Sequence, residues 1–297
     1  MADLGYDGRV AIVTGAGGGL GRQHALLLAS RGARLVINDV GGSVHGDGGN
    51  EGPAHAVVKE LEALGAEAVA NTDSVATPEG GEAIVQTAID AFGQVDIVIN
   101  NAGILRDKTF HNMTPDLVEP VFDVHLKGAF YVTKPAWIRM REQGYGRVVN
   151  TTSGSGLFGM FGQSNYAAAK AGLVGLTRVL ANEGAKHNIK ANAIAPIAYT
   201  RMTEEIMPGM EEKLKPELVS PVVGWLTHED CPVSGEVFSV GGGYVAKVFL
   251  GLTPGIVDKE LTPESVRDHF DEIRAEPGYI VPTQPMDEFA VVFPKLD

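Results

Sequence analysis

Short apolar runs rich in β-branched residues alternate with longer segments of helical periodicity along most of the chain. Most of these runs are nearly continuous, as in parallel strands that are covered by helices on both faces. The predicted strands are Arg9–Thr14, Arg34–Asp39, Ala66–Thr72, Val95–Asn100, Arg147–Thr152, Ile189–Ala195 and Glu236–Val240. The predicted helices are 19–31, 53–64, 78–92, 115–142, 165–187 and 213–227. This alternation predicts an α/β fold with a doubly wound, parallel, seven-stranded sheet and helices on both faces.

Two segments depart from the alternation. Gly41–Gly52 is a glycine-rich connection, longer than the usual strand-to-helix loop, and its composition predicts a mobile segment. The Pro-rich end of the chain holds one predicted helix, 263–275, with Thr262 as its cap and Pro263 at its first position. We therefore expect one domain over residues 1–250 and a C-terminal extension over 251–297.

Composition and charge narrow the function classes. With 44% apolar and 21% charged residues the chain is an ordinary globular protein. A net charge of −13 disfavours a general nucleic-acid or anionic-membrane surface. Cys231 is the only cysteine, which excludes an internal disulfide, and the ligand-type residues 228–231 are consecutive and cannot converge on one ion, so no metal site is predicted. No apolar run reaches the roughly 20 residues of a membrane span, and the amino terminus lacks the apolar core of a secretory signal. We expect a cytoplasmic protein.

A glycine cluster follows the first predicted strand. The segment Thr14–Gly21 has the pattern TGxxxGxG through Gly15, Gly19 and Gly21, with Leu20 at the place of the third glycine in the strict GxGxxG spacing. Glycines let backbone N–H groups and a helix N-terminus approach a pyrophosphate closely. Because the cluster lies between a strand and a helix, it predicts dinucleotide binding by a Rossmann-type fold.

An acidic residue ends the second predicted strand. Asp39 lies 18 residues after Gly21, where a carboxylate can bind the adenosine ribose 2′-hydroxyl and repel a 2′-phosphate. This position favours NAD over NADP. Arg22, a basic residue close to the glycine loop, favours the opposite choice.

Tyr166 and Lys170 are separated by one helical turn, and Ser153 precedes Tyr166 by 13 residues. A tyrosine has an ordinary pKa of about 10, too high for an efficient base near neutrality, and a neighbouring ammonium is expected to lower it. Ser153 can then hydrogen-bond the substrate oxygen while a nicotinamide accepts a hydride. The arrangement predicts a secondary-alcohol dehydrogenase.

Together with Asn100–Gly103 (NNAG) after the fourth strand, these motifs resemble the short-chain dehydrogenase/reductase family over about residues 8–245. The resemblance implies cofactor contacts from Asp73 and Ser74 at the adenine, from Asn101 and Ala102 at the ribose, and from Tyr166, Lys170 and Thr200 at the nicotinamide end. His125 stands where the family usually has Asn; its main-chain carbonyl is expected to serve a proton relay, with a base or a helix-packing role as the alternatives. The sequence departs from the family at Pro196-Ile197 and in the early position of Thr200.

A closer resemblance is to the dehydrogenase units of peroxisomal multifunctional enzymes of type 2, through NAGILRD at 101–107, His125, FGQ at 161–163 and RMT at 201–203. It implies a stand-alone enzyme that oxidises a (3R)-3-hydroxyacyl-CoA with NAD. The alternatives are a 17β-hydroxysteroid or other secondary-alcohol dehydrogenase and a non-catalytic NAD-binding sensor. We expect Arg106, Lys108 or Arg201 to contact the CoA phosphates, and helices 115–142 and 165–187 to pair in a homodimer or homotetramer.

Overall fold

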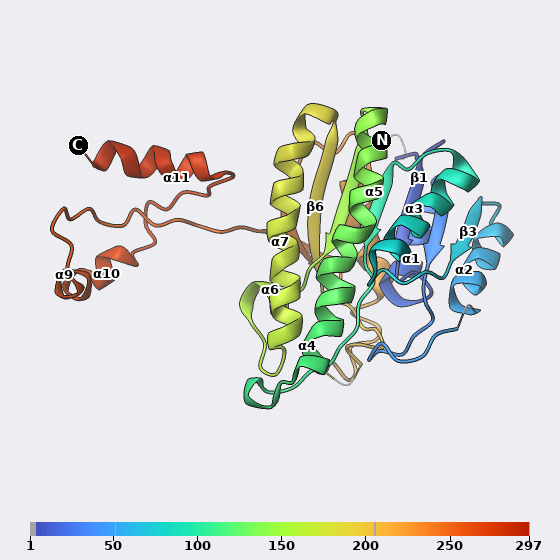
Figure 1. Ribbon diagram of the computed structural model, residues 1–297, viewed down its shortest axis with the longest axis horizontal. Coiled ribbons are helices and arrows are strands. Elements are labelled where there is room, and N and C mark those ends of the chain that lie inside the picture. Colours follow the sequence, from blue (N-terminus) through green and yellow to red (C-terminus); the bar gives the residue numbers. More distant parts are fainter. Residues whose placement is uncertain (1–3, 51, 205, 297) are drawn as a thin grey trace. The chain divides into compact units, whose positions relative to one another are not determined.

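The computed structural model describes residues 4–50, 52–204 and 206–296, and the chain divides into two compact units, Met1–Lys247 and Val248–Asp297. One sheet with the strand order β3-β2-β1-β4-β5-β6-β7-β8 forms the centre of the first unit (Figure 1). Its strands are β1 Val10–Thr14, β2 Arg34–Asn38, β3 Ala68–Asn71, β4 Ile97–Asn100, β5 Gly146–Thr151, β6 Ile189–Pro196, β7 Val237–Gly241 and β8 Tyr244–Val248. The pairs from β3 through β7 are all parallel, which confirms the predicted fold class.

The predicted number of strands is wrong by one. β8 follows β7 across Gly242 and Gly243, whose φ angles are 57° and 84°. A two-residue connection of this kind joins antiparallel neighbours, and glycine adopts its positive φ angles without strain. The side chains of Tyr244 and Val245 are exposed, so this edge strand lacks the buried apolar pattern from which the other strands were predicted.

Helices cover both faces of the sheet. α1 Gly19–Ala29, α2 Gly52–Ala63 and α8 Ser220–Thr227 contribute to one apolar cluster, and α3 Pro78–Phe92 and α5 Gly128–Gln143 to the other. The remaining helices of this unit are α4 Pro115–Phe122, α6 Gly154–Phe158 and α7 Ser164–Gly184, with short 3₁₀ turns at Phe110–Asn112, Ala185–His187 and Pro216–Leu218. Residues of β1 illustrate the two layers, because Ile12 packs in one cluster while Ala11 and Val13 pack in the other.

Two predicted helices differ from the observed ones. The segment predicted as a helix over 115–142 contains a π-helical turn, Asp123–Lys127, between α4 and α5. The segment predicted over 213–227 becomes regular only at Ser220, after the 3₁₀ turn that begins at Pro216. Proline fixes φ and lacks an N–H group, so it favours the start of a helix over its interior.

The second unit contains α9 Pro263–Asp268, α10 Phe270–Ile273, α11 Pro285–Val292 and a 3₁₀ turn, Phe293–Lys295. The predicted cap is confirmed, since the Thr262 hydroxyl accepts the Ser265 N–H at 3.0 Å. The single predicted helix is interrupted at His269, and α11 was not predicted.

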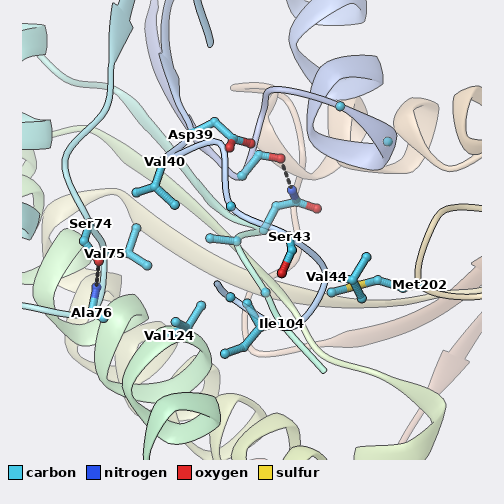
Figure 2. Close-up of a pocket in the computed structure, with 18 of the residues that line it drawn as sticks. Asp39, Val40, Ser43, Val44, Ser74, Val75, Ala76, Ile104, Val124 and Met202 are labelled. Atoms are coloured by element: carbon cyan, nitrogen blue, oxygen red, sulfur yellow. Dashed lines mark hydrogen bonds between the residues drawn. The ribbon is translucent and has the colours of Figure 1, made fainter. Parts of the chain in front are cut away.

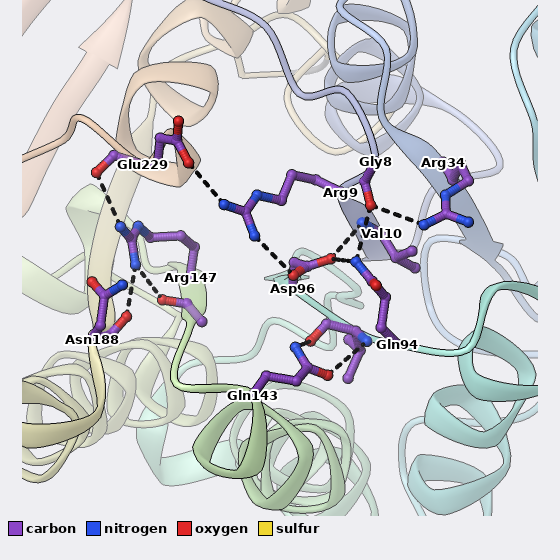
Figure 3. A network of polar contacts seen from close by, with 12 residues as sticks. Gly8, Arg9, Val10, Arg34, Gln94, Asp96, Gln143, Arg147, Asn188 and Glu229 are labelled. Atoms are coloured by element: carbon purple, nitrogen blue, oxygen red, sulfur yellow. Dashed lines mark hydrogen bonds and ion pairs between the residues drawn. The ribbon is translucent and has the colours of Figure 1, made fainter.

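The amino ends of the strands are held by a polar network (Figure 3). The carboxylate of Asp96, just before β4, accepts the Val10 N–H at 2.8 Å and a guanidinium N–H of Arg9 at 3.3 Å. Arg147 in β5 is 1% exposed and donates to main-chain carbonyls of Gly146, Asn188, His228 and Glu229. Because these groups satisfy one another, this end of the sheet is structural, and the open end is the carboxyl one.

Candidate active site

The glycine loop between β1 and α1 has a geometry that only glycine can adopt. Gly15 and Gly19 have φ angles of 62° and 50°. A Cβ atom on Gly17 would lie 2.8 Å from Asp39 Cγ, and one on Gly21 would lie 2.4 Å from the Gly15 carbonyl oxygen. Real Cβ atoms do not approach so closely, so only glycine at these two positions lets the loop pack this tightly against its neighbours.

A cavity of about 400 Å³ opens at the carboxyl ends of the strands (Figure 2). Its walls come from the segments after β1, β2, β3 and β4, together with residues 200–202 after β6. Eight residues predicted to bind a cofactor line it: Gly15, Gly19, Leu20, Asp39, Ser74, Asn101, Ala102 and Thr200. Ligands of doubly wound sheets bind at this end of the strands.

Four of the predicted cofactor residues do not line this cavity: Gly21, Asp73, Tyr166 and Lys170. Gly21 instead packs against the Gly15 carbonyl behind the loop. The carboxylate of Asp73 accepts the side-chain amide of Asn71 at 2.7 Å, and its main-chain carbonyl accepts the amide of Asn38 at 2.8 Å. Asp73 therefore stabilises the turn after β3 and brings its neighbour Ser74 to the cavity.

Asp39 and Arg22 have different surroundings. The two carboxylate oxygens of Asp39 accept the N–H groups of Gly17 at 2.8 Å and Gly41 at 2.7 Å, and the residue lines the cavity. The guanidinium of Arg22 instead forms two contacts with the carboxylate of Glu60, one of them at 2.8 Å. Arg22 is not part of the cavity wall, whereas the carboxylate-bearing Asp39 is. The glycine cradle and this carboxylate fit a dinucleotide with a free 2′-hydroxyl.

Ser153, Tyr166 and Lys170 converge beside this cavity. Ser153 follows β5 and caps α6, its hydroxyl accepting the Ser155 N–H at 3.1 Å. Tyr166 lies in the first turn of α7, and its side chain is close enough to the Ser153 hydroxyl for that group to act on the pKa of the phenol. The ring of Tyr166 packs in one apolar cluster with Ile104, a residue of the cavity wall.

The electrostatics of this group differ from the sequence-based expectation. Burial raises the pKa of Tyr166, while the Ser153 hydroxyl acts in the opposite direction. Lys170 is 3% exposed, and burial lowers its pKa to about 7. Its Nζ donates to the Thr151 carbonyl at 2.5 Å and lies 5.6 Å from the centre of the Tyr166 ring. Burial outweighs the effect of Ser153, so the pKa of the Tyr166 phenol lies above its ordinary value.

His125 lies in the π-helical turn and is buried. Its Nε2 atom is 3.0 Å from the main-chain nitrogen and 2.8 Å from the main-chain oxygen of Ile104. A Cβ atom on Gly103 would lie 2.4 Å from the imidazole, so the NAG turn closes directly on this ring. His125 and Lys170 also border a second void of about 10 Å³, close to the space that one water needs.

The connection after β2 is part of the site, although it is not among the site residues predicted from the sequence. Val40, Gly42, Ser43, Val44 and Gly46 line the cavity. The neck of the loop is closed by a hydrogen bond from the Asn50 N–H to the Val40 carbonyl at 2.9 Å. Residues 41–50 thus have a defined, hydrogen-bonded conformation, and the mobility of Gly41–Gly52 stays a prediction. Repeated glycines at turns with positive φ were the available signal of a compact loop.

Comparison with known proteins gives consistent matches. Residues 9–211 match the family model described as short chain dehydrogenase. The chain is 49% identical over 275 residues to the mouse peroxisomal multifunctional enzyme type 2, covering 91% of this chain and 37% of that protein. It is 54% identical over 266 residues to a short-chain type dehydrogenase/reductase of Mycobacterium tuberculosis, covering 89% and 92% of the two chains. The full-length Drosophila melanogaster peroxisomal multifunctional enzyme type 2 superposes with a TM-score of 0.83 at 36% identity, covering 98% of this chain and 50% of that one.

These matches differ in extent, since the chain spans well under half of the mouse protein but nearly all of the mycobacterial one. Among the residues that the structure describes, no helix is long and apolar enough to cross a membrane.

Proposed function

Because this chain belongs to the short-chain dehydrogenase family, as its three motifs predict, we propose that it oxidises the 3-hydroxyl of a (3R)-3-hydroxyacyl-CoA to the ketone with NAD. The observation that carries the proposal is the convergence of Ser153, Tyr166 and Lys170 next to a glycine-lined cavity. A tyrosine hydroxyl paired with a serine hydroxyl can bind one alcohol oxygen from two sides and accept its proton.

In this mechanism Tyr166 takes the proton of the substrate hydroxyl. Ser153 donates a hydrogen bond to the same oxygen and keeps that oxygen within hydrogen-bonding distance of the Tyr166 hydroxyl. Bound NAD would accept the hydride from the carbon that bears this hydroxyl group. Lys170 is held near the phenol by the Thr151 carbonyl, where its Nζ can bind a ribose hydroxyl and pass a proton toward the void beside His125. The main chain of His125 would complete this relay.

NAD would be held by residues of the cavity wall. The N–H groups of the loop from Gly15 to Leu20 would bind the pyrophosphate, and Asp39 the adenosine ribose. Asn101 supports the loop, because its amide donates to the carbonyls of Thr14 and Gly15 at 3.0 Å each. Thr200 would face the nicotinamide end, and its main-chain N–H is already bound by the Thr203 hydroxyl at 2.8 Å.

The substrate class rests on likeness and on charge. Relatives at 47–49% identity are named multifunctional enzymes and hydratase-dehydrogenase-epimerases of peroxisomes. A protein with a net charge of −13 needs local cations to bind the phosphates of CoA. Arg201 lines the cavity, and Lys108 lies beside the Ser153–Tyr166 segment, its N–H donating to the Gly162 carbonyl at 2.8 Å. We assign the CoA contacts to these two residues and not to Arg106, whose guanidinium is bound by protein groups.

All of these residues lie in the predicted domain 1–250, and no role is assigned to 251–297. We retain the homodimer or homotetramer as a prediction, supported by exposed Phe130 and Ile138 on α5 and Val179 on α7. Light scattering at micromolar concentration would test it, and a monomer would contradict it.

A cytoplasmic location also remains a prediction, against relatives that are named as peroxisomal.

Replacing Tyr166 with Phe tests the mechanism. The variant keeps the ring in its apolar cluster but loses the hydroxyl, so we expect kcat to fall by about 10²–10⁴-fold. NAD binding, measured by calorimetry, should change little because the ring and Lys170 are retained. A folded variant with near-normal kcat would show that another group accepts the proton.

A further inference from the structure

The loop Gly41–Asn50, which we call the β2 loop, is built as a compact unit. Its neck is closed by the Asn50 N–H on the Val40 carbonyl and by the Gly41 N–H on the Asp39 carboxylate. At its tip, the Ser43 N–H donates to the Asp47 carbonyl at 3.0 Å, and the Ser43 hydroxyl accepts the N–H groups of His45 and Asp47. A loop ordered by its own hydrogen bonds can move as one body or be fastened as one body.

The tip of the β2 loop is docked on the segment that follows the NAG turn. The Leu105 N–H donates to the Val44 carbonyl at 2.9 Å, and the Leu105 carbonyl lies 2.9 Å from Nδ1 of His45. Gly46 has φ 84°, and a Cβ atom there would lie 3.0 Å from the side chain of Ile104. The contact places Ser43 and Val44 on the cavity wall with Ile104 and Met202 (Figure 2).

Arg106 fastens this contact from outside. Its Nε donates to the His45 carbonyl at 2.9 Å, one Nη to the Asp116 carbonyl at 3.1 Å, and the other Nη to the Asp47 carboxylate at 3.2 Å. Arg106, His45, Asp47 and Asp116 are absent from the cavity wall. The guanidinium thus joins the loop tip to the start of α4 without touching the space that a ligand would fill.

We propose that Arg106 is a positioning residue for dinucleotide binding, which holds the β2 loop as a fixed wall of the cofactor cavity. The inference rests on the proposed function for the identity of the ligand. We call the three hydrogen bonds of the Arg106 guanidinium the clamp. With the clamp intact, the β2 loop is ordered before NAD binds. Without the clamp, NAD binding must also order the loop, which weakens the affinity for NAD. Since Arg106 touches neither the cavity nor Tyr166, its loss acts on cofactor affinity and not on the chemical step.

The clamp can be dissected by three substitutions. Arg106→Gln removes the fork of donors, and we expect the Kd for NAD, measured by calorimetry without substrate, to rise roughly tenfold. Arg106→Lys keeps the charge, but one compact ammonium cannot reach three acceptors, so this variant should restore only part of the affinity for NAD. Asp47→Asn should change the Kd less than about twofold, because exposed ion pairs contribute little and the Asp47 side chain is 75% exposed. Arg267→Gln, at a 72% exposed arginine of the second unit, is the matched control and should leave the Kd unchanged.

Hydrogen exchange of the same proteins without nucleotide reports the loop directly. Faster exchange of peptides covering residues 41–50 and 104–106 in Arg106→Gln, together with the weaker NAD binding and a kcat at saturating NAD near the wild-type value, supports the proposal. A released loop with an unchanged Kd for NAD would overturn it, as would unchanged exchange. An unchanged Kd for NAD with a raised KM for acyl-CoA would instead make Arg106 a CoA contact. Failure of the wild-type protein to bind NAD would overturn the proposed cofactor, and with it this inference, whatever the exchange of the loop.

Discussion

The imidazole of His125 packs edge-on against the ring of Tyr166, with 5.1 Å between the ring centres and 90° between the ring planes. The same imidazole contacts the main chain of Ile104 on the cavity wall. Burial lowers the pKa of His125 well below its ordinary value, and the charge of Lys170 lowers it further. The ring is therefore neutral near pH 7, and it connects the proposed catalytic tyrosine to the cofactor cavity by packing.

A His125→Asn variant separates this packing role from a role as the base. We expect kcat to fall roughly 10–100-fold, because small displacements of reacting groups are costly. The pH profile of kcat/KM between pH 6 and 8 should keep the shape of the wild-type profile, since His125 does not titrate there. Loss of an ionisation from that profile in the variant would make His125 the base.

Asp39 should determine the choice of dinucleotide. We expect higher kcat/KM with NAD than with NADP, and Asp39→Ala should reduce that preference by about 10–100-fold, the contribution of a hydrogen bond to a charged group. Asp39→Asn is the matched variant, because it removes the charge and keeps an acceptor oxygen for one of the two N–H groups, of Gly17 and Gly41, that the carboxylate binds. A native preference for NADP would contradict the assignment and would mean that Arg22 leaves Glu60 to bind a phosphate.

Lys170 should make stability depend on pH. Its pKa falls from 10.5 to about 7 on folding because it is buried, so between these values the unfolded chain binds a proton that the folded chain does not. Wild-type stability therefore decreases as the pH falls through this window, by about 1.4 kcal/mol per pH unit at most. Lys170→Met removes this dependence, so the variant gains stability relative to the wild type from pH 10 to pH 7, with no further change below it. Parallel curves of unfolding free energy, measured with denaturant, would contradict the low pKa.

Lys108 and Arg201 should bind the CoA moiety. Replacing both with Gln is expected to raise KM for an acyl-CoA about tenfold or more and leave kcat nearly unchanged, because phosphate contacts far from the reacting carbon bind ground and transition states equally. High salt should raise the wild-type KM in the same direction. A KM that responds to neither change would remove these residues from the substrate site.

The strands and the glycine loop could be predicted from sequence because their signals are local. The residues of β1 form an uninterrupted buried run, and the TGxxxGxG pattern indicates that the backbone needs glycine at Gly15, Gly19 and Gly21. The position of Asp39 at a strand end was equally readable from spacing.

The rest depends on contacts between distant segments. The π-helical turn places the His125 imidazole against Gly103. The helical periodicity of residues 115–142 does not predict this contact. Arg106 was predicted as a possible contact of the CoA phosphates, because its hydrogen bonds to His45 and Asp47 depend on how the loop folds. The pKa of Lys170 follows from complete burial rather than from its spacing to Tyr166.

Oxidation of a (3R)-3-hydroxyacyl-CoA by this protein is tested most directly by following NAD reduction on a matched panel of substrates. The panel holds (3R)- and (3S)-3-hydroxyacyl-CoA thioesters, free 17β-hydroxysteroids and simple secondary alcohols. We predict that the purified protein reduces NAD with the (3R)-hydroxyacyl-CoA and not with its (3S) isomer, and that the activity is lost in Tyr166→Phe. Strong activity on free hydroxysteroids with none on any hydroxyacyl-CoA, or tight NAD binding with no reduction on any substrate, would contradict the account.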